Sequence, residues 1–310
     1  IRVLKLANLI EINGNDIKWI GKDTYVVQVG DQVDNCRPND KKCNEPSDNN
    51  LSSYSGELAE DIRILELFTD LNTQAEKENG AVISLYGNHE LMNVTGNMNY
   101  VSYKDVMKFK PDGTYEEAKK IRQESFAPGN KYAEFLACTR MPAVIIGSFI
   151  FVHAGFITTF LEEYKITSGD DLYKISYSLR KWLLKSIDKH NVRNIINGRG
   201  HSLFWDRILG NIPPNMNNND PQCIKYLKNA LEIFKVDKMI IGHTPQFHQH
   251  NMGINKTCGD ALWRIDFGGS YCFHQFDDSF KKSGKTVELR NVQVLKIIDD
   301  KEIIILSEKN

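Results

Sequence analysis

The sequence lacks the features that mark membrane proteins and nucleic-acid-binding proteins. None of the apolar runs in its 310 residues approaches the roughly 20 residues that a membrane-spanning helix needs. The formal net charge is only -1, so no excess of positive charge favours nucleic acid or an acidic lipid surface. We therefore expect neither nucleic acid nor a membrane among the partners of this protein.

The sequence also lacks a CxxC pair among its six cysteines, which argues against a zinc ribbon. Cys36 and Cys43 lie close together in a polar segment and could form a disulfide. The alternative that we favour is that the thiols stay reduced, because disulfides are rare inside cells. On that ground we expect a cytoplasmic location.

The overall composition is that of a globular protein with one full-sized core. Hydrophobic residues make up 41% of the chain and charged residues 25%, which is an ordinary balance. No internal repeat or linker divides the sequence, so we expect residues 1–310 to form a single domain. Residues 1–10 have the pattern of an amphipathic helix that lacks a capping residue. We therefore expect the natural protein to have further residues before Ile1.

Apolar patterning predicts an α/β chain in which helices dominate the middle and strands dominate the end. The predicted strands cover residues 24–29, 81–86, 143–152 (two strands about a Gly147-Ser148 turn), 237–241, 261–267, 287–298 and 302–307. The predicted helices cover 57–79, most of 101–140, 171–190 and 222–235, and residues 37–56 and 210–221 have the composition of loops. The order strand, helix, strand over residues 24–86 predicts two parallel strands joined by a crossover.

Four of the predicted strands are each followed, within a few residues, by acidic, amide or imidazole side chains. They are Asp31 and Asp34 after the first strand, Asn88, His89 and Glu90 after the second, His153 after residues 143–152, and His243 after residues 237–241. Taken singly, each would more often be a turn residue, a helix cap or a buried core histidine. Four such clusters in succession favour one shared site, because open α/β folds bind ligands at the carboxyl ends of strands.

The residue types in these clusters suit a metal ion with oxygen and nitrogen ligands. Carboxylates, an amide and imidazoles are typical of Mn, Fe, Zn or Mg sites, whereas soft metals prefer thiolates. A metal ion in such a site can lower the pKa of bound water to about 7. His248 and His250 follow no predicted strand directly, and His190 ends a predicted helix, where a cation suits the helix dipole. We predict that these three histidines are not ligands.

The motifs GDQVD (30–34), GNHE (87–90), HAG (153–155) and GHTP (242–245) resemble the signatures of the calcineurin-like metallophosphoesterases. Within that superfamily the chain is similar to the phosphoprotein phosphatases. The longer stretches GNHELMNVTGNMNYVS and WRIDFGGS are most similar to the Shewanella-like branch. The resemblance extends over nearly the whole chain. It implies a four-layer α/β/β/α sandwich, in which two mixed sheets pack face to face and helices flank them.

The resemblance also implies a centre of two divalent metal ions, for which Mn, Fe or Zn would be suitable. Asp31 would bridge the two ions. Asn88, His153 and His243 would complete the shell of the second ion. The family's GDxHG motif, which completes the first site, is absent from this sequence, and no histidine precedes His89. We expect that motif to lie before Ile1, so this chain would carry one complete metal shell and bind at most one ion tightly.

The resemblance assigns the proton transfer to His89 and Asp34. His89 would be the general acid that protonates the leaving oxygen, a role for which an imidazolium is suited near neutral pH. Asp34 would hydrogen-bond to His89, fix its orientation and raise its pKa. Glu90 would orient a neighbouring residue rather than bind metal.

Arginine is missing where the family has it. Asn35 stands directly after the second aspartate, where the family has a phosphate-binding arginine, and Asn99 stands where the branch favours another. The guanidinium group matches phosphate oxygens with two parallel hydrogen bonds, so we consider Arg37, Arg207 and Arg199 as replacements. The alternative for each is a surface salt bridge.

The function implied is hydrolysis of phosphomonoesters, with a phosphoprotein or a small phosphate ester as the substrate and a metal-activated hydroxide as the nucleophile. A phosphodiesterase or a dinucleoside polyphosphate hydrolase would use the same metal cluster. A non-catalytic pseudophosphatase, which keeps the fold as a binding module, is the alternative of another class. The preference between phosphoserine or phosphothreonine and phosphotyrosine stays open, as does the oligomeric state.

Overall fold

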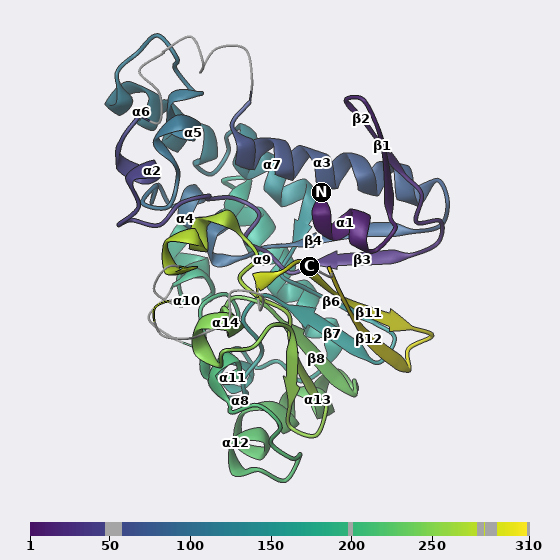
Figure 1. The fold of residues 1–310 in the computed structure, drawn as a ribbon. Helices are drawn as coiled ribbons and strands as arrows, with labels where there is room; N and C mark the ends of the chain where they lie inside the picture. The colour runs from purple at the N-terminus through teal and green to yellow at the C-terminus, as the bar shows by residue number, and fades with distance from the viewer. Residues whose placement is uncertain (47–57, 198–200, 278–281, 283–289, 309–310) are drawn as a thin grey trace.

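The computed structural model, drawn in Figure 1, describes residues 1–46, 58–197, 201–277, 282 and 290–308. Among these residues the strands form a three-stranded sheet, a five-stranded sheet and two hairpins. Helices lie along the outer sides of both larger sheets. The chain therefore has the expected fold class, a sandwich of central sheets flanked by helices.

The three-stranded sheet confirms the predicted crossover. Strand β3 (Tyr25–Gln28) pairs in parallel with β4 (Ala81–Leu85), and helix α3 (Glu60–Glu76) connects them. A short strand, β5 (Arg140–Met141), adds to β4, also in parallel. Apolar residues on one face of α3 are buried, which fixes the helix along the sheet (Figure 1).

The five-stranded sheet has the order β6-β7-β8-β10-β9 and is mixed. The predicted pair around Gly147-Ser148 is present as β6 (Ala143–Ile146) and β7 (Phe149–Val152), which are antiparallel. Strand β8 (Lys238–Ile241) is parallel to both β7 and β10 (Leu262–Arg264). The edge strand β9 (Asn255–Thr257), antiparallel to β10, was not predicted. Its three residues are too few to show a period of two.

The two hairpins lie at the ends of the chain. The helix expected over residues 1–10 is wrong in its length, because α1 covers only Arg2–Leu6 and is followed by β1 (Ile10–Asn13) and β2 (Asp16–Trp19). The two residues of the hairpin loop, Gly14 and Asn15, were a hairpin signal, which the apolar residues before them obscured. The second hairpin, β11 (Gln293–Ile298) with β12 (Glu302–Ser307), confirms the predicted terminal strands. Residues 287–289 of that prediction lie outside the described ranges.

The remaining helices match the predictions only in part, because those at residues 41–44, 88–94, 158–163, 193–196, 208–211 and 246–249 lie outside the predicted helical ranges. They are α2 (Lys41–Asn44), α4 (Asn88–Val94), α5 (Tyr103–Met107), α6 (Tyr115–Phe126), α7 (Lys131–Thr139), α8 (Thr158–Glu163), α9 (Leu172–Leu183), α10 (Arg193–Ile196), α11 (Ile208–Asn211), α12 (Pro221–Cys223), α13 (Asn229–Phe234) and α14 (Gln246–Gln249). The helix predicted over 171–190 ends early, at Leu183. The helix predicted over 222–235 contains one π-helical turn, Ile224–Lys228. Residues 47–56 of the predicted loop 37–56, and the first residue of the helix predicted over 57–79, lie outside the described part of the chain.

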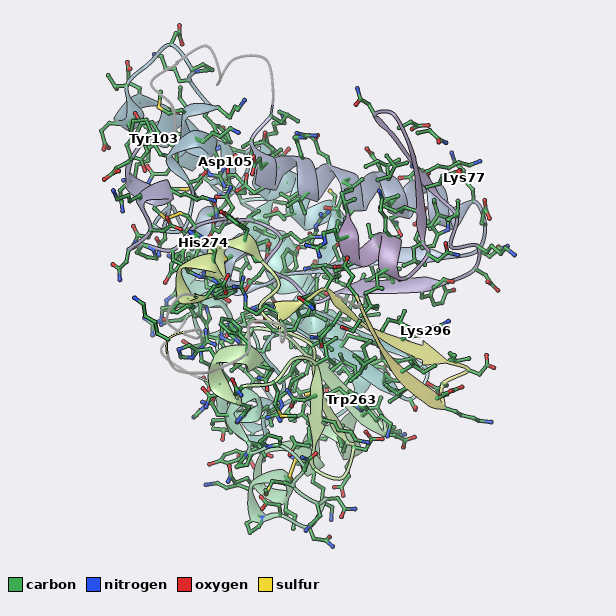
Figure 2. All side chains as sticks on the ribbon, in the orientation of Figure 1. Lys77, Tyr103, Asp105, Trp263, His274 and Lys296 are labelled. Carbon is green, nitrogen blue, oxygen red and sulfur yellow. A yellow bond between two sulfur atoms is a disulfide. The ribbon has the colours of Figure 1, made fainter. Side chains whose placement is uncertain are left out.

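Both faces of the five-stranded sheet are covered. On one face Ile150, Val152 and Ile241 belong to the largest buried apolar cluster, together with residues of α8, α9 and α13. On the other face Ile240 and Trp263 pack against apolar residues of the β11–β12 hairpin. Figure 2 shows Trp263 on β10 and Lys296 on the neighbouring hairpin. Burial on both faces makes this sheet a rigid mount for the loops at its carboxyl edge.

Four of the six cysteines form disulfides, so the expectation of reduced thiols is wrong for them. Cys36 pairs with Cys43, and Cys223 pairs with Cys258, with Cα atoms 5.7 and 5.6 Å apart. These separations are typical of disulfides. The second bond joins the end of α12 to the turn after β9, a contact that the sequence spacing does not reveal. No helix in the described part of the chain is both long and apolar enough to span a membrane.

Candidate metal centre and active site

Four side chains predicted as metal ligands meet where β3, β4, β7 and β8 end. His153 Nε2 lies 3.0 Å from Asn88 Oδ1 and 3.1 Å from His243 Nδ1. It also lies 3.3 Å from Asp31 Oδ2. The ligand atoms of Asp31, His153 and His243 all lie within 4.8 Å of one another. The parallel pairs β3–β4 and β7–β8 explain this meeting, because parallel strands bring loops that are distant in sequence to one edge.

Backbone carbonyl groups orient the two imidazoles as metal ligands. His153 Nδ1 lies 2.7 Å from the carbonyl oxygen of Val29, and His243 Nε2 lies 3.1 Å from that of Trp205. Because a carbonyl only accepts, these outer nitrogens carry protons, and the inner nitrogens face the ligand cluster. Burial holds the pKa of His243 well below its ordinary value, so this ring is neutral. Burial favours the neutral ring of His153 as well, but the Asp31 carboxylate outweighs burial and raises the pKa of His153. The centre of the cluster therefore favours positive charge, and its carboxylate, amide and imidazole donors fit a metal ion.

Three of the site residues have an unusual backbone conformation. The φ angles are 60° for Asp31, 70° for Asp34 and 63° for His243, in the left-handed region that costs a non-glycine residue about 1 kcal/mol or more. Gly87 lies against Asp31, and a Cβ at position 87 would overlap the Asp31 carboxylate. Strain of this kind concentrates at functional sites, where the surrounding structure holds it in place.

Glu90 supports the loop that carries Asp31. Its fully buried carboxylate accepts hydrogen bonds from the backbone N–H groups of Asp31, Gln32, Val33 and Gly87, at 2.6 to 3.1 Å. Burial raises the pKa of this carboxyl group, and the nearby Asp31 raises it further. Glu90 thus connects the loop after β3, which carries Asp31, to Gly87 after β4. The sequence predicted that Glu90 orients a neighbouring residue rather than binding metal.

His89 lies beside the ligand cluster and is paired with Asp34. Its Nδ1 is 2.6 Å from Asp34 Oδ2, and its backbone N–H donates to Asp31 Oδ1 at 3.1 Å. Burial favours the neutral ring, but the carboxylates of Asp31 and Asp34 outweigh burial and raise the pKa of His89 to about 9. The ring is therefore an imidazolium at neutral pH. With Nδ1 bound to Asp34, Nε2 is the nitrogen left to donate a proton.

The two described arginine candidates line the same cavity as His89 and Asp31, with a volume of about 1580 Å³. The guanidinium of Arg37 lies 4.3 Å from the ring centre of Phe273. Arg207 Nη1 donates to the backbone carbonyl of His243 at 2.9 Å, and burial lowers the pKa of Arg207. The third candidate, Arg199, lies outside the described residues.

Asn35 has a structural role in place of the arginine that the resemblance would put there. Its Nδ2 donates to Asp105 Oδ2 at 2.5 Å, and its Oδ1 accepts from the backbone N–H of Ser102 at 3.1 Å. Asp105 belongs to α5 and is marked in Figure 2. Asn99 is exposed, and its backbone N–H donates to the side chain of Asn97. Neither asparagine is placed to bind phosphate as the paired N–H donors of an arginine would.

The three histidines predicted to be non-ligands are not part of the ligand cluster. His250 Nε2 lies 3.2 Å from the carbonyl oxygen of Gly210. The ring of His248 packs edge-on against Phe276, and His190 lies in a 3-10 turn after α9.

Sequence reasoning missed the residues behind Asp34. Asn93 Nδ2 donates to Asp34 Oδ1 at 2.8 Å, and the guanidinium of Arg122 donates to the oxygen of Asn93 at 2.8 and 3.2 Å. Asn93 follows His89 by one helical turn on α4, so its place on the same face could have been predicted. Arg122 lies on α6 and had no such signal.

Comparisons with known proteins agree with the motifs. The model of the calcineurin-like phosphoesterase family matches residues 4–247. A relative from Acanthamoeba polyphaga mimivirus, described only as uncharacterised protein R398, is 37% identical over 259 residues, which cover 78% of this chain and 99% of the relative. Shewanella-like protein phosphatase 2 of Arabidopsis thaliana is 25% identical, and the match covers 86% of this chain and 66% of that protein.

A further relative and a solved structure extend this similarity. Shewanella-like protein phosphatase 1 of Plasmodium berghei is 27% identical, and this chain spans 62% of its length. A cold-active protein tyrosine phosphatase of known structure aligns with a TM-score of 0.60 at 18% identity, over 99% of this chain and 75% of that one. At that level of identity the structural match supports the fold alone.

Proposed function

Since this chain belongs to the calcineurin-like phosphoesterase family, we propose that it hydrolyses phosphomonoesters, with a phosphoprotein or a small phosphate ester as the substrate. The main support is a proton donor directly beside the ligand cluster. Asn88 Oδ1 faces His153 within the cluster, and the next residue, His89, is held by Asp34. The first turn of α4 thus presents a metal ligand and an imidazolium side by side.

We propose that Asp31, Asn88, His153 and His243 hold one divalent metal ion. Their oxygen and nitrogen atoms suit Mn, Fe or Zn. When bound, that ion would acidify a water molecule and withdraw charge from the phosphoryl oxygens. Among the described residues, Asp31, His153 and His243 form the one such cluster of histidine and acidic residues that we find, and Asn88 adjoins it. We therefore propose that the chain binds a single ion tightly. The two-metal centre implied by the resemblance would need ligands that these residues do not supply.

His89 is the proposed general acid. When the ester bond breaks, the departing oxygen needs a proton, and His89 Nε2 donates it while Asp34 keeps hold of Nδ1. The pKa of about 9 keeps the ring charged before the reaction. General-acid catalysis of this kind accelerates a reaction by about 100- to 10,000-fold.

Arg37 and Arg207 are the proposed phosphate-binding residues. Both line the cavity that contains Asp31 and His89, and each guanidinium can donate two parallel hydrogen bonds to phosphate oxygens. Arg207 is anchored by the carbonyl of His243, which places its charge next to the ligand cluster. Arg37 rests on the ring of Phe273, which limits the motion of its side chain.

The proposal is tested with p-nitrophenyl phosphate and bis(p-nitrophenyl) phosphate, assayed with the purified chain and Mn²⁺. We expect hydrolysis of the monoester and little of the diester. Preferential hydrolysis of the diester would instead identify a phosphodiesterase. Metal binding without hydrolysis of either ester would identify a non-catalytic binding module, and both of these results would overturn the proposal.

We also propose that residues 1–310 form a single domain. This is supported by the largest apolar cluster of the described residues, which extends from Val33 to Leu262. The expected cytoplasmic location stays a prediction, and the two disulfides weigh against it, because disulfides are rare in reducing compartments.

A further inference from the structure

We propose that Asn93 and Arg122 are positioning residues for His89, and that they act through Asp34. This inference rests on the proposed function, in which His89 is the general acid. Neither residue reaches the ligand cluster or the substrate cavity. Both are completely buried, and a chain of hydrogen bonds connects them to the imidazole.

The first part of the chain lies within and beside α4. Asp34 uses one carboxylate oxygen for each partner: Oδ2 lies 2.6 Å from His89 Nδ1, and Oδ1 accepts from Asn93 Nδ2 at 2.8 Å. Asn93 Nδ2 also donates to the backbone carbonyl of His89 at 3.0 Å. The side-chain amide of Asn93 therefore binds both the Asp34 carboxylate, which pairs with the imidazole, and the backbone of His89.

Arg122 determines which way that amide points. Its Nε and Nη2 donate to Asn93 Oδ1 at 3.2 and 2.8 Å. A guanidinium group only donates hydrogen bonds, so the amide oxygen of Asn93 must face it. The amide NH₂ must then face Asp34. Without the Arg122 guanidinium, the Asn93 amide could rotate by half a turn and present its oxygen to Asp34. The two oxygens would then repel each other.

The same arginine also holds the backbone of Asp34. Arg122 pairs with the buried carboxylate of Asp61 on α3, with Nη2 and Oδ2 2.6 Å apart. The backbone N–H of Asp34 donates to that Oδ2 at 3.4 Å. Asp34 has the left-handed φ of 70°, a conformation that persists only where neighbours enforce it. Arg122 thus reaches both ends of Asp34, the backbone through Asp61 and the carboxylate through Asn93.

The consequence is a fixed direction for His89. Side-chain networks that are fully buried and fully hydrogen-bonded are rigid. A carboxylate held at both oxygens cannot rotate, so the imidazole bound to it keeps Nε2 aimed into the cavity that His89 lines. A displacement of about 1 Å at a reacting group can lower a rate by about 100-fold. The network therefore contributes to proton donation without contacting the substrate.

The chain contains a matched control pair. Arg264 on β10 is also fully buried, and its Nε and Nη2 both donate to the side-chain oxygen of Asn255 on β9. That pair has the same chemistry and the same burial, but it contacts neither His89 nor Asp34. The test variants are Asn93→Leu and Arg122→Lys, and the controls are Asn255→Leu and Arg264→Lys.

The first measurement needs neither metal nor turnover. The proton on His89 Nδ1, shared with a carboxylate, should give a far-downfield ¹H NMR signal, assigned by its loss in His89→Asn. We expect this signal to disappear or broaden in both test variants and to persist in both controls. Persistence of the signal in the test variants would overturn the inference, whatever the activity of the protein.

The second measurement separates orientation of the acid from general damage. Hydrolysis of phenyl phosphate depends on the general acid, whereas 2,4-dinitrophenyl phosphate has a leaving group that needs no proton. We expect Asn93→Leu and Arg122→Lys to lower kcat for phenyl phosphate by about 100-fold and kcat for the dinitrophenyl ester much less. An equal loss on both esters, or a test variant that behaves like its control, would overturn the inference. Failure of the wild-type chain to hydrolyse either ester would overturn the proposed function instead. Arg122→Lys keeps the positive charge beside Asp61. It therefore provides the test if Asn93→Leu does not fold.

Discussion

Replacing Asp34 with asparagine tests the role assigned to the pair of Asp34 and His89. The variant keeps the size of the side chain and an oxygen that can accept from His89 Nδ1, but it removes a negative charge 2.6 Å from that nitrogen. Burial favours the neutral ring, and after the substitution only the Asp31 carboxylate opposes it. We therefore expect the pKa of His89 to fall from about 9 toward its ordinary 6.5. An imidazole carries its proton below its pKa and loses it above. Proton donation by His89 should therefore be lost as the pH rises through about 9 in the wild type, and at a lower pH in the variant.

The size of the effect follows from the two pKa values. At about pH 7.5, an imidazole with a pKa of about 9 is almost fully protonated, and one with a pKa of 6.5 is about one-tenth protonated. At about pH 6 both are mostly protonated. The ratio of wild-type to Asp34→Asn turnover should therefore grow about tenfold between these pH values. A loss of ring orientation lowers the variant's turnover at both pH values alike and leaves this growth unchanged.

The assay is kcat for phenyl phosphate at saturating Mn²⁺, measured from about pH 5.5 to about pH 9. Metal content is determined on the same samples, so that loss of the ion is recognised separately. Asp40→Asn is the control, because Asp40 is a buried carboxylate that caps α2 away from the ligand cluster. A ratio that stays constant with pH would refute the assignment of His89 as a general acid held charged by Asp34.

Further substitutions distinguish the roles of the other site residues. His89→Asn should lower kcat by about 100- to 10,000-fold while the metal content stays near that of the wild type, and loss of the metal would show that His89 is a ligand. His243→Ala removes one of the two inner imidazole nitrogens, so metal analysis should find the bound ion largely lost; full retention would remove His243 from the ligand set. Arg37→Met should weaken competitive inhibition by inorganic phosphate by about tenfold through loss of a charged hydrogen bond, with a much smaller effect on kcat, and unchanged inhibition would exclude Arg37 from phosphate binding. Glu90→Gln replaces a carboxylate that accepts four backbone N–H groups, and it should lower the free energy of unfolding by about 2–4 kcal/mol in urea denaturation. A loss well below that range would contradict the supporting role of Glu90.

Much of the ligand cluster could be predicted because it depends on local sequence and one topological rule. Asp31, Asn88, His153 and His243 each follow an apolar strand, and parallel strands bring such positions to one edge. The crossover from β3 through α3 to β4 was equally readable, since its apolar residues have clear periods of two and 3.6.

The residues that could not be predicted depend on packing between distant elements. Arg122 meets Asn93 only because α6 packs beside α4, and nothing in the sequence of either helix specifies that contact. The carbonyl of Trp205 that orients His243 belongs to a segment without regular structure, where backbone direction has no sequence signal. The disulfide between Cys223 and Cys258 likewise reflects the position of β9, a strand too short to predict.

Four side chains from four strand ends are proposed to hold a metal ion beside His89. Anomalous diffraction at the manganese edge, from crystals of the 310-residue chain grown with Mn²⁺, tests this proposal most directly. We predict a single strong peak about 2 Å from the ligand atoms of Asp31, Asn88, His153 and His243. A peak bound instead by His89, or no peak among these four residues at full Mn²⁺ loading, would show that these four residues do not form the metal site.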